Sequence, residues 1–357
     1  MLGWIARPIT ALPFVVICVA ICGCGNDHNS PPLPTPVPTP TPSVVTYSSG
    51  GNYPEGIGID GSDHVWIANR YSDSVAELTN AGTLLATFPV GHRPHGLKID
   101  RKGTGAIWVQ NTAGGGPGAL SSCPGGTTGT VTALAGSGAL IGSFCSGGDS
   151  PQHAQFDASG NVWVTNQGSN TVAEINGSTG ALINTFATGE GPHAIAKDQS
   201  GNFWIGNYYS GTVSVLNSSG TSIGTIPEDR LGLQPTGNDI DPSGNLWQSV
   251  QSIDQVAVFA AAPSFAPIRT EAVGVGPRGV TIDAAGNVFV ANQQSNNVIE
   301  FNSTGSRIAE FQVGACPENM AVDSSGDVWV TNACSSTVSV LKGVAVPSPH
   351  SDDDSNG

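Results

Sequence analysis

The side chains best suited to chemistry gather directly after a proline that recurs seven times along the chain. The residues that follow these prolines are Glu55, His95, Gln152, His193, Thr236, Arg278 and Glu318. His153 and Asn319 lie one place later in their own repeats. Imidazoles and carboxylates are the groups that proteins use for proton transfer and for binding divalent cations. These positions are therefore the first candidates for a functional site.

The repeated position predicts a ring of binding residues. The residues expected to contact a ligand are Glu55, His95, Gln152, His153, His193, Arg278 and Glu318. Within this set, Glu318, Glu55 and His95 are consecutive round the ring, and two carboxylates with an imidazole can bind a divalent cation or act as an acid–base set. Glu55 and Glu318 are the candidate metal ligands, with magnesium or calcium as the ion. The alternative is that all of them are solvated loop residues around a water-filled channel, because the set has no spacing typical of a metal motif.

The repeat that carries these residues predicts the fold. Each unit has an aspartate six positions after its proline, and the steps between prolines are 40, 57, 41, 43, 42 and 40 residues. The prolines are Pro54, Pro94, Pro151, Pro192, Pro235, Pro277 and Pro317. Four short strands in about 40 residues is the period of a propeller blade. We therefore predict an all-β, seven-bladed β-propeller over residues 44–346.

The third unit shows the expected strands, which we call A to D. Strand A surrounds Phe156, strand B covers 162–165, strand C covers 171–175 and strand D covers 181–186. Strand B carries a tryptophan in six units and Phe289 in the seventh, and we expect these rings to pack between blades rather than to stack on a sugar. Asparagine ends strand B in six units and is expected to hold the loop that follows.

The two ends of the repeat region predict how the ring closes. The last unit has three clear strands, because Pro347 cuts the next apolar stretch short. Residues 44–50, before the first unit, resemble strand D at 84–91. An N-terminal strand therefore completes the last blade, which closes the ring and removes two sheet edges.

Four cysteines inside the propeller predict two disulfides. Loops before strand A and after strand B share one face of a propeller, and Cys316 and Cys334 lie in two such loops of blade 7. Cys123 and Cys145 lie in the corresponding loops of blade 2. The pairs Cys123–Cys145 and Cys316–Cys334 are thus local, and a zinc site made from all four thiolates is the alternative. Cys123 belongs to a glycine-rich insertion at 112–128, which we expect to cover part of the pocket on this face.

The N-terminal residues predict export. An apolar stretch from Ile9 to Ile21 is too short for a comfortable membrane span and resembles a bacterial lipoprotein signal peptide over 1–23. Cys24 is then the lipidated residue, and Gly25 after it favours the outer membrane or cell surface. An ordinary signal peptide is the alternative. Residues 24–43 form a Pro/Thr-rich extended tether, and 347–357 form a disordered acidic tail.

The net charge of the chain limits the kinds of molecule that it is expected to bind. The formal net charge is −15, with only 12 lysines and arginines. This composition argues against a nucleic-acid partner and against electrostatic binding to anionic lipid. We expect a monomer that is attached to the membrane through its lipid.

Several strings resemble known propeller families. VWVTNQGSNTV (162–172), VFVANQQSNNV (288–298) and VWVTNACSSTV (328–338) are similar to NHL and YVTN-type repeats. The Pro-His strings at Pro94 and Pro192 resemble those of streptogramin B lyases of the virginiamycin type, and the resemblance covers roughly 44–341. It implies a seven-bladed propeller with a magnesium-dependent ring-opening elimination, in which His95 and His193 are the acid–base candidates. The glutamate that the lyases carry after the strand B aromatic is asparagine in six blades here.

Two functions follow, and whether the chain is an enzyme stays open. The first is a non-enzymatic binding or scaffold module at the cell envelope, which takes a glycan, peptide or protein on the disulfide-bearing face. The second is a streptogramin-lyase-like or lactonase-like enzyme that uses a metal held by the ring. A lactonase of the gluconolactonase type also needs an asparagine ligand, for which Asn238 is a weak candidate.

Overall fold

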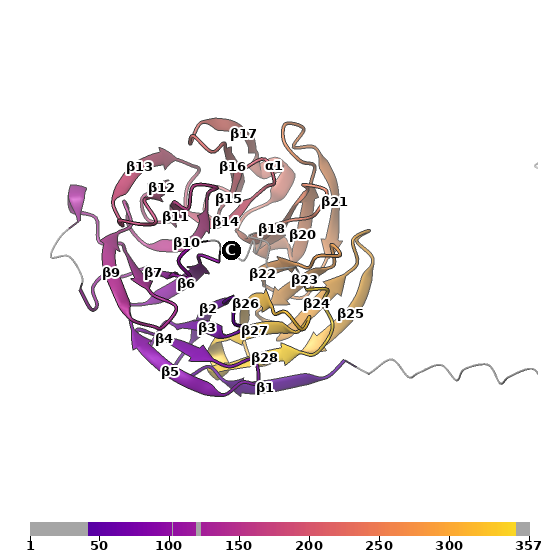
Figure 1. Ribbon diagram of the computed structural model, residues 1–357. Helices are drawn as coiled ribbons and strands as arrows, with labels where there is room; N and C mark the ends of the chain where they lie inside the picture. The colour runs from indigo at the N-terminus through magenta and orange to yellow at the C-terminus, as the bar shows by residue number, and fades with distance from the viewer. Residues whose placement is uncertain (1–41, 102, 119–122, 348–357) are drawn as a thin grey trace, which may run out of the picture. The chain divides into compact units, whose positions relative to one another are not determined.

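The computed structural model describes residues 42–101, 103–118 and 123–347. The signal peptide, nearly all of the tether with Cys24, and the tail from residue 348 lie outside these ranges, so what the sequence predicts for them stays a prediction. The described chain forms seven four-stranded antiparallel sheets around a common centre (Figure 1). The predicted all-β, seven-bladed propeller is confirmed.

Six blades use four consecutive strands, here given from the centre outwards as strands A to D. Blades 1 to 3 are β2 (Pro54–Ile59), β3 (Val65–Asn69), β4 (Ser74–Leu78) and β5 (Leu84–Pro89); β6 (Pro94–Ile99), β7 (Ile107–Asn111), β8 (Thr130–Leu134) and β9 (Leu140–Cys145); β10 (Pro151–Phe156), β11 (Val162–Asn166), β12 (Thr171–Ile175) and β13 (Leu182–Ala187). Blades 4 to 6 are β14 (Pro192–Lys197), β15 (Phe203–Asn207), β16 (Thr212–Leu216) and β17 (Ser222–Ile226); β18 (Pro235–Ile240), β19 (Leu246–Val250), β20 (Gln255–Phe259) and β21 (Pro267–Ala272); β22 (Pro277–Ile282), β23 (Val288–Asn292), β24 (Asn297–Phe301) and β25 (Arg307–Gln312).

Blade 7 takes its outer strand from the other end of the chain. Its strands are β26 (Pro317–Val322), β27 (Val328–Asn332), β28 (Thr337–Leu341) and β1 (Val44–Ser48). The short helical segments are α1 (Glu228–Leu231), η1 (Pro124–Gly126), η2 (Gln251–Ile253) and η3 (Ala333–Ser335).

The repeated aspartate closes the turn between strands A and B. In blade 4, Asp198 Oδ1 accepts backbone N–H bonds from Ser200 and Asn202, both at 2.9 Å. Its Oδ2 accepts the indole N–H of Trp204 at 3.0 Å. The same indole bond is made by Trp66, Trp163, Trp247 and Trp329. One side chain therefore fixes the turn and the aromatic ring of the next strand together.

The strand B aromatics join each blade to the next. Trp66 of blade 1 packs with Leu97 and Ile99 of blade 2, and six further clusters of the same kind follow round the ring. In the last of them, Trp329 of blade 7 packs with Ile57 of blade 1. All seven aromatic side chains are buried. The predicted packing role of these rings is confirmed.

The N-terminal strand β1 occupies the place of strand D in blade 7. It pairs with β28 from Val44 opposite Leu341 to Ser48 opposite Thr337. Tyr47 stacks on Trp329 with 5.9 Å between ring centroids, which is the place that Phe88 holds over Trp66 in blade 1.

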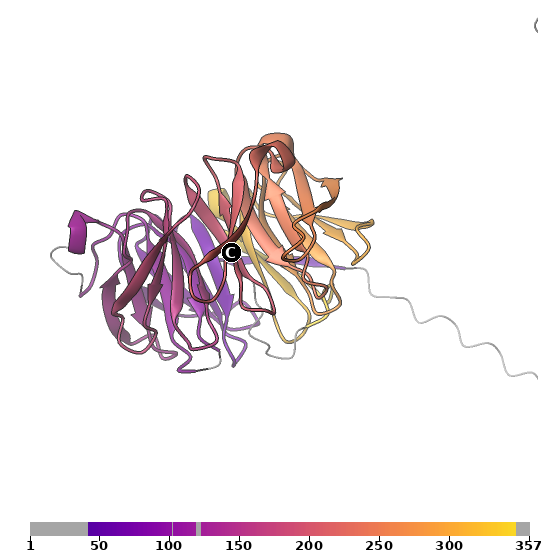
Figure 2. The same ribbon diagram turned by 90° about the horizontal axis from the view of Figure 1, so that it is seen from above.

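The strands run between two loop faces, as the side view in Figure 2 shows. Loops before strand A and after strand B lie on one face, and the A–B and C–D turns lie on the other. Both predicted disulfides are present on the first face, Cys123–Cys145 in blade 2 and Cys316–Cys334 in blade 7. We call it the disulfide face.

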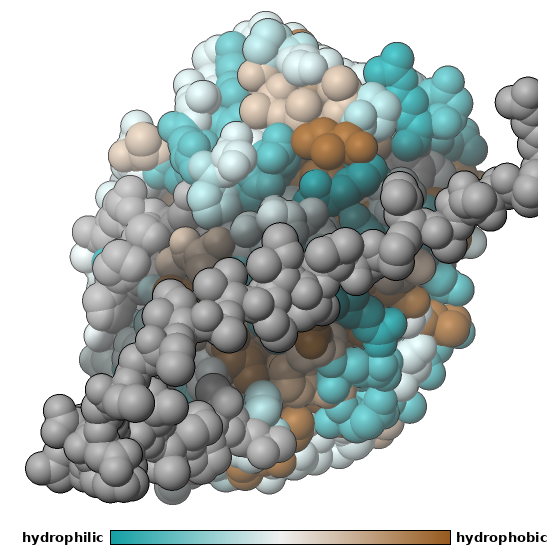
Figure 3. Space-filling model, turned by 90° about the vertical axis from the view of Figure 1, so that its right-hand side faces the viewer, coloured by the Kyte–Doolittle hydropathy of each residue, from teal (hydrophilic) through white to brown (hydrophobic). Residues whose placement is uncertain are grey.

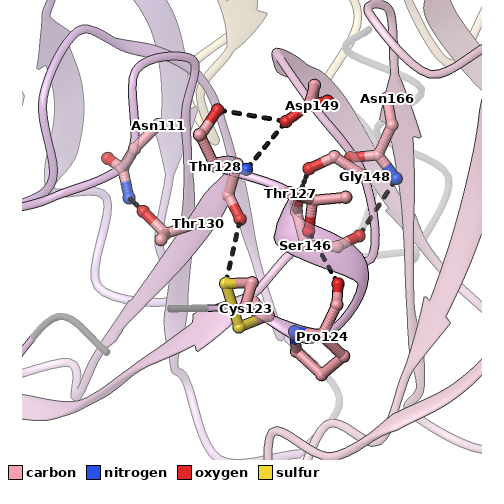
Figure 4. The surroundings of a disulfide bond; sticks show 12 residues. Asn111, Cys123, Pro124, Thr127, Thr128, Thr130, Ser146, Gly148, Asp149 and Asn166 are labelled. Atoms are coloured by element: carbon pink, nitrogen blue, oxygen red, sulfur yellow. Dashed lines mark hydrogen bonds between the residues drawn. A yellow bond between two sulfur atoms is a disulfide. The ribbon is translucent and has the colours of Figure 1, made fainter. Parts of the chain in front are cut away.

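The glycine-rich insertion is fixed to the outer part of blade 2. Thr128 donates its backbone N–H and its hydroxyl to Asp149, at 2.7 and 3.0 Å, next to the Cys123 disulfide (Figure 4). Ser143 of β9 donates to the carbonyl of Pro117 at 2.7 Å, and this part of the chain lies at the outer edge of the ring in Figure 1. The described residues of the insertion therefore do not cover the central cavity, contrary to expectation, because they are bound to β9 and to the loop after it.

The outer strands separate their exposed apolar residues with charges. Figure 3 views the molecule from the side of β21 and β25, where teal residues surround separate brown ones. Ile268 and Ile308 are exposed there, and the pairs Arg269–Glu271 and Arg307–Glu310 lie next to them. Charged side chains on an edge strand oppose pairing with another chain. Among the described residues, no helix is long and apolar enough to cross a membrane.

Candidate functional site

A β-bulge in strand A brings the repeated position to the centre of the ring. In β10, Pro151 pairs with Asn166 and Ala154 with Val164, so Gln152 and His153 together face one residue of β11. The same shift follows the proline in all seven blades. A bulge of this kind re-aims the side chains of the extra residues.

Hydroxyl groups of strand B hold three of these bulges in place from the neighbouring blade. Thr165 donates to the carbonyl of His193 at 2.7 Å, and Thr331 donates to the carbonyl of Glu55 at 2.8 Å. Ser249 donates to the carbonyl of Arg278 at 2.6 Å. Each accepting carbonyl belongs to the residue directly after the repeated proline. The site residues are therefore positioned by the contact between blades as well as by their own strand.

A cavity of about 320 Å³ lies on the disulfide face at the centre of the ring. Its lining residues are Tyr53, Glu55, Arg70, Tyr71, His95, Gln152, Gln167, His193, Tyr208, Tyr209, Arg278 and Glu318. Six of the seven predicted binding residues line it. The seventh, His153, is buried beside the cavity, with its ring centroid 4.9 Å from those of His95 and His193. Their roles in ligand binding stay predictions.

The two predicted metal-binding carboxylates are already paired. Arg70 Nη1 donates to both oxygens of Glu55 at 2.9 Å. Arg278 Nε lies 3.7 Å from Glu318 Oε2, and the Gln293 amide donates to the other Glu318 oxygen. A magnesium or calcium ion between Glu55 and Glu318 would have to displace these donors.

Burial controls the protonation of the site. It raises the pKa of Glu55 and of Glu318, and the neighbouring arginines act in the opposite direction. Burial also lowers the pKa of His95 and His193 well below the usual range and lowers the pKa of His153 to about 3. The cause is that a charged ring loses its hydration. At neutral pH the three rings are neutral, and each keeps one nitrogen lone pair.

The three histidines form one cluster. They come from β6, β10 and β14, the inner strands of three consecutive blades, and one nitrogen from each ring lies within 4.8 Å of the others. The sequence predicted proton transfer for His95 and His193, but it did not predict that His153 lies against both of them. The bulge explains this outcome, because it turns both residues after the proline toward the axis.

Half of the residues that line the cavity were not predicted from the sequence. Arg70, Gln167 and Tyr208 each follow the asparagine that ends strand B, and Tyr71 and Tyr209 come one place later. Tyr53 precedes the repeated proline. The repeat could have identified these residues. The position after the strand B asparagine lies on the same face of the propeller as the position after the proline.

Three residues with expected polar roles lie outside the cavity lining. Thr236 donates to the carbonyl of Pro277 at 2.9 Å, and Asn319 donates to the carbonyl of Glu55 at 3.2 Å. Asn238, the weak lactonase candidate, donates to the carbonyl of Trp204 at 3.1 Å. These side chains tie neighbouring blades together.

A second cavity, of about 310 Å³, lies at the opposite end of the channel, between the A–B turns of blades 2 and 3. Lys197, which lines it, donates to the carbonyl of Phe156 at 2.9 Å. It holds none of the predicted site residues.

Comparison with known proteins supports the fold alone. No protein-family description matches the chain, and neither does any curated protein sequence. Virginiamycin B lyase from Staphylococcus aureus superimposes with a TM-score of 0.70 over 85% of this chain and 99% of the lyase, at 14% sequence identity. A catalytically inactive variant of that lyase with quinupristin gives a TM-score of 0.72 at 14% identity, again over 85% and 99% of the chains. Hydrazine synthase from Kuenenia stuttgartiensis gives 0.68 at 14% identity, over 87% of this chain and 99% of the synthase chain. The chain is thus similar in architecture to streptogramin B lyases.

Proposed function

We propose that this chain is a cell-envelope lipoprotein whose propeller binds a polar segment of a glycan, peptide or protein on the disulfide face. The observation that carries the proposal is the central cavity, with a polar wall and exposed tyrosines. Tyr71 and Tyr209 are 63% and 60% exposed, although they lie next to buried polar groups. Tyrosine supplies a large contact area at a low entropic cost and is enriched at binding surfaces.

The charges of the cavity favour a ligand without a strong net charge. Arg70 is paired with Glu55, and Arg278 lies next to Glu318, so the two cations are balanced by two carboxyl groups. The amides of Gln152 and Gln167 add donors and acceptors without charge. Such a wall recognises hydroxyl and amide groups, which glycans and peptide backbones both present.

A ligand screen with rim variants tests this proposal. The full chain is applied to an array of neutral oligosaccharides and to a peptide library, and hits are measured by calorimetry. We expect a hit whose affinity falls about tenfold or more in Tyr71→Ala and in Tyr209→Ala, because exposed aromatic anchors dominate binding energy. Ile183→Ala, on the exposed outer strand β13, is the matched control and leaves affinity unchanged. An equal loss of affinity in Ile183→Ala, or an unchanged affinity in both tyrosine variants, contradicts the assignment.

The second candidate is a lyase-like or lactonase-like enzyme that works from the same cavity. It is favoured by one observation: an imidazole and a carboxyl group lie side by side in the cavity, with His95 Nε2 3.6 Å from Glu55 Oε2. Calorimetric titration with magnesium and calcium separates the two functions. The binding-module proposal expects no tight binding, because Arg70 occupies both oxygens of Glu55. Tight binding that is lost in both Glu55→Gln and Glu318→Gln would favour the enzyme.

The proposed location rests on the N-terminal sequence. We predict that an expressing Gram-negative host incorporates radiolabelled palmitate into the chain at Cys24, because the apolar segment ends in Gly23-Cys24 and leads into the Pro/Thr tether. Labelling should be lost in Cys24→Ser. Labelling of that variant at the level of the parent would contradict the lipoprotein assignment.

A further inference from the structure

We propose that His95, His153 and His193 bind one transition-metal ion, for which zinc is the best match. The proposal does not depend on the ligand suggested above, since it concerns the buried base of the cavity. It also differs in ion and ligands from the magnesium or calcium site expected at Glu55 and Glu318.

The geometry is close to that of a three-histidine metal site. One ring nitrogen from each histidine lies within 4.8 Å of the other two. Zinc binds imidazole nitrogen at about 2.0–2.1 Å, so ligand nitrogens of a tetrahedral site lie about 3.3 Å apart. Shifts of about 1 Å in the three ring positions would bring them to this separation, and side-chain torsions supply such shifts without moving the strands.

Two of the rings present a buried nitrogen that has no other partner. Within the described part of the chain, Nδ1 of His95 and Nδ1 of His193 have no hydrogen-bond partner, and both residues are buried. A buried polar atom without a partner costs roughly 1–3 kcal/mol in general. A metal bound at Nδ1 would give these two atoms the partner that they lack.

On the opposite side of the His95 ring, a carboxyl group lies near Nε2. His95 Nε2 faces Glu55 Oε2 at 3.6 Å, and Arg70 fixes that carboxylate from its other side. Burial lowers the pKa of His193, and the backbone of Thr236 acts against this larger effect. Metal-binding histidines commonly donate their second ring N–H to a carboxylate or a carbonyl, which orients the ring.

The ligand type selects the metal. Imidazole suits zinc, copper, nickel and cobalt, whereas magnesium and calcium prefer oxygen ligands. Three histidines leave a fourth tetrahedral position for water or for a donor atom of a ligand.

A second group of possible ligands supplies a control. Asp60, His64 and Glu77 also lie close together. Their side chains already form hydrogen bonds with other protein groups. His64 Nδ1 is hydrogen-bonded to Glu77 at 2.7 Å, and Asp60 accepts the Trp66 indole N–H at 2.9 Å. This group serves the turn between β2 and β3.

Zinc titration of the full chain tests the proposal. The oxidised protein is stripped with a chelator and titrated with zinc chloride in competition with a chromophoric chelator. We expect one zinc per chain, with affinity about 100-fold weaker in His153→Gln and about 10-fold weaker in Glu55→Gln. His64→Gln and His92→Gln are the controls and should bind as the parent does. Unchanged affinity in a folded His153→Gln variant, or no zinc binding by the parent, overturns the site.

A spectroscopic readout on the unmodified chain covers the case in which a variant fails to fold. X-ray absorption of the zinc-loaded parent should show three imidazole nitrogens in the first coordination shell. The cobalt-loaded parent should show the intense visible bands of a tetrahedral ion. A shell with oxygen ligands only, or with a single imidazole, contradicts the three-histidine assignment.

Discussion

At the scale of single residues, Glu300 is a buried carboxyl without the partner that its counterparts have. Glu77 pairs with His64 at 2.7 Å, and Glu174 accepts the Asn161 amide at 2.9 Å. Glu300 lies opposite Phe289, the one strand B aromatic that lacks an N–H group. Burial, assisted by the Asp283 charge, raises the pKa of Glu300 from 4.5 to about 7.

We predict that Glu300→Gln stabilises the protein above pH 7. The folded-state pKa is raised, so the contribution of Glu300 to stability is fully present below about pH 4.5 and is lost as pH rises toward 7. The amide does not ionise, and the gain at pH 8 over pH 5 should be about 1–2 kcal/mol, below the full value of the shift because the site is partly hydrated. Urea unfolding at the two pH values measures it. A stability change that is the same at both pH values would contradict this account.

Individual site residues were predictable only where the repeat register marks them. The place after the proline identified Glu55, His95 and Glu318 because it recurs at a constant offset. The clustering of the three histidines was not predictable from the sequence. It depends on a bulge that turns two consecutive residues toward the axis of the propeller. The Glu55–Arg70 pair was not predicted for a related reason. Arg70 occupies a different position of the repeat from Glu55, namely the one directly after strand B.

At the scale of the blade, the aspartate-to-indole bond makes a measurable contribution. Trp204 donates to Asp198 at 3.0 Å, whereas in blade 2 the turn is longer and Asp100 instead accepts bonds from Gly103 and Thr104. No bond from the Trp108 indole to Asp100 is present in the described structure.

We therefore predict that Trp204→Phe destabilises the fold more than Trp108→Phe. Both changes remove the same ring volume from a buried site, but only the first also removes a hydrogen bond to the turn aspartate. The difference should be about 1 kcal/mol in the free energy of unfolding. Denaturant unfolding of the two variants measures it, and equal losses would contradict a role for the bond.

The disulfide in blade 7 should stabilise its loop face by limiting the unfolded chain. Cys316 and Cys334 are 18 residues apart in sequence. Closing a loop of this size contributes about 3 kcal/mol in the entropic account. The double variant Cys316→Ser/Cys334→Ser should lose this amount on denaturant unfolding. Peptide mass mapping without reduction checks the pairing itself, and a free thiol at any of the four cysteines of exported protein would refute it.

At the scale of the whole molecule, the ring depends on a strand from the far end of the chain. We predict that deletion of residues 43–50 abolishes cooperative unfolding or causes dimerisation, because it exposes the edge of β28 and removes Tyr47 from Trp329. Calorimetry and sedimentation measure the two outcomes. Deletion of residues 31–38, in the tether, is the matched control. If the chain without 43–50 melts like its parent, β1 has no role in closure.

The architecture was predictable almost completely, and the reason is repetition. Seven copies of one register let each weak strand signal support the others, and the predicted strand C at 171–175 matches β12 (Thr171–Ile175). The glycine-rich insertion has no counterpart in other blades, so nothing in the sequence showed that its described residues would bind β9 rather than line the cavity.

The position of β1 has a consequence for the order of events during synthesis. Thr46 and Ser339 face each other in one sheet although they are 293 residues apart. Among the described strands, β1 is therefore synthesised first and is the last to find its partner. Contacts of such long range slow folding, because the entropy of a long loop is lost before the contact forms. During that interval β1 is a free strand, and we expect chaperones of the compartment to bind there.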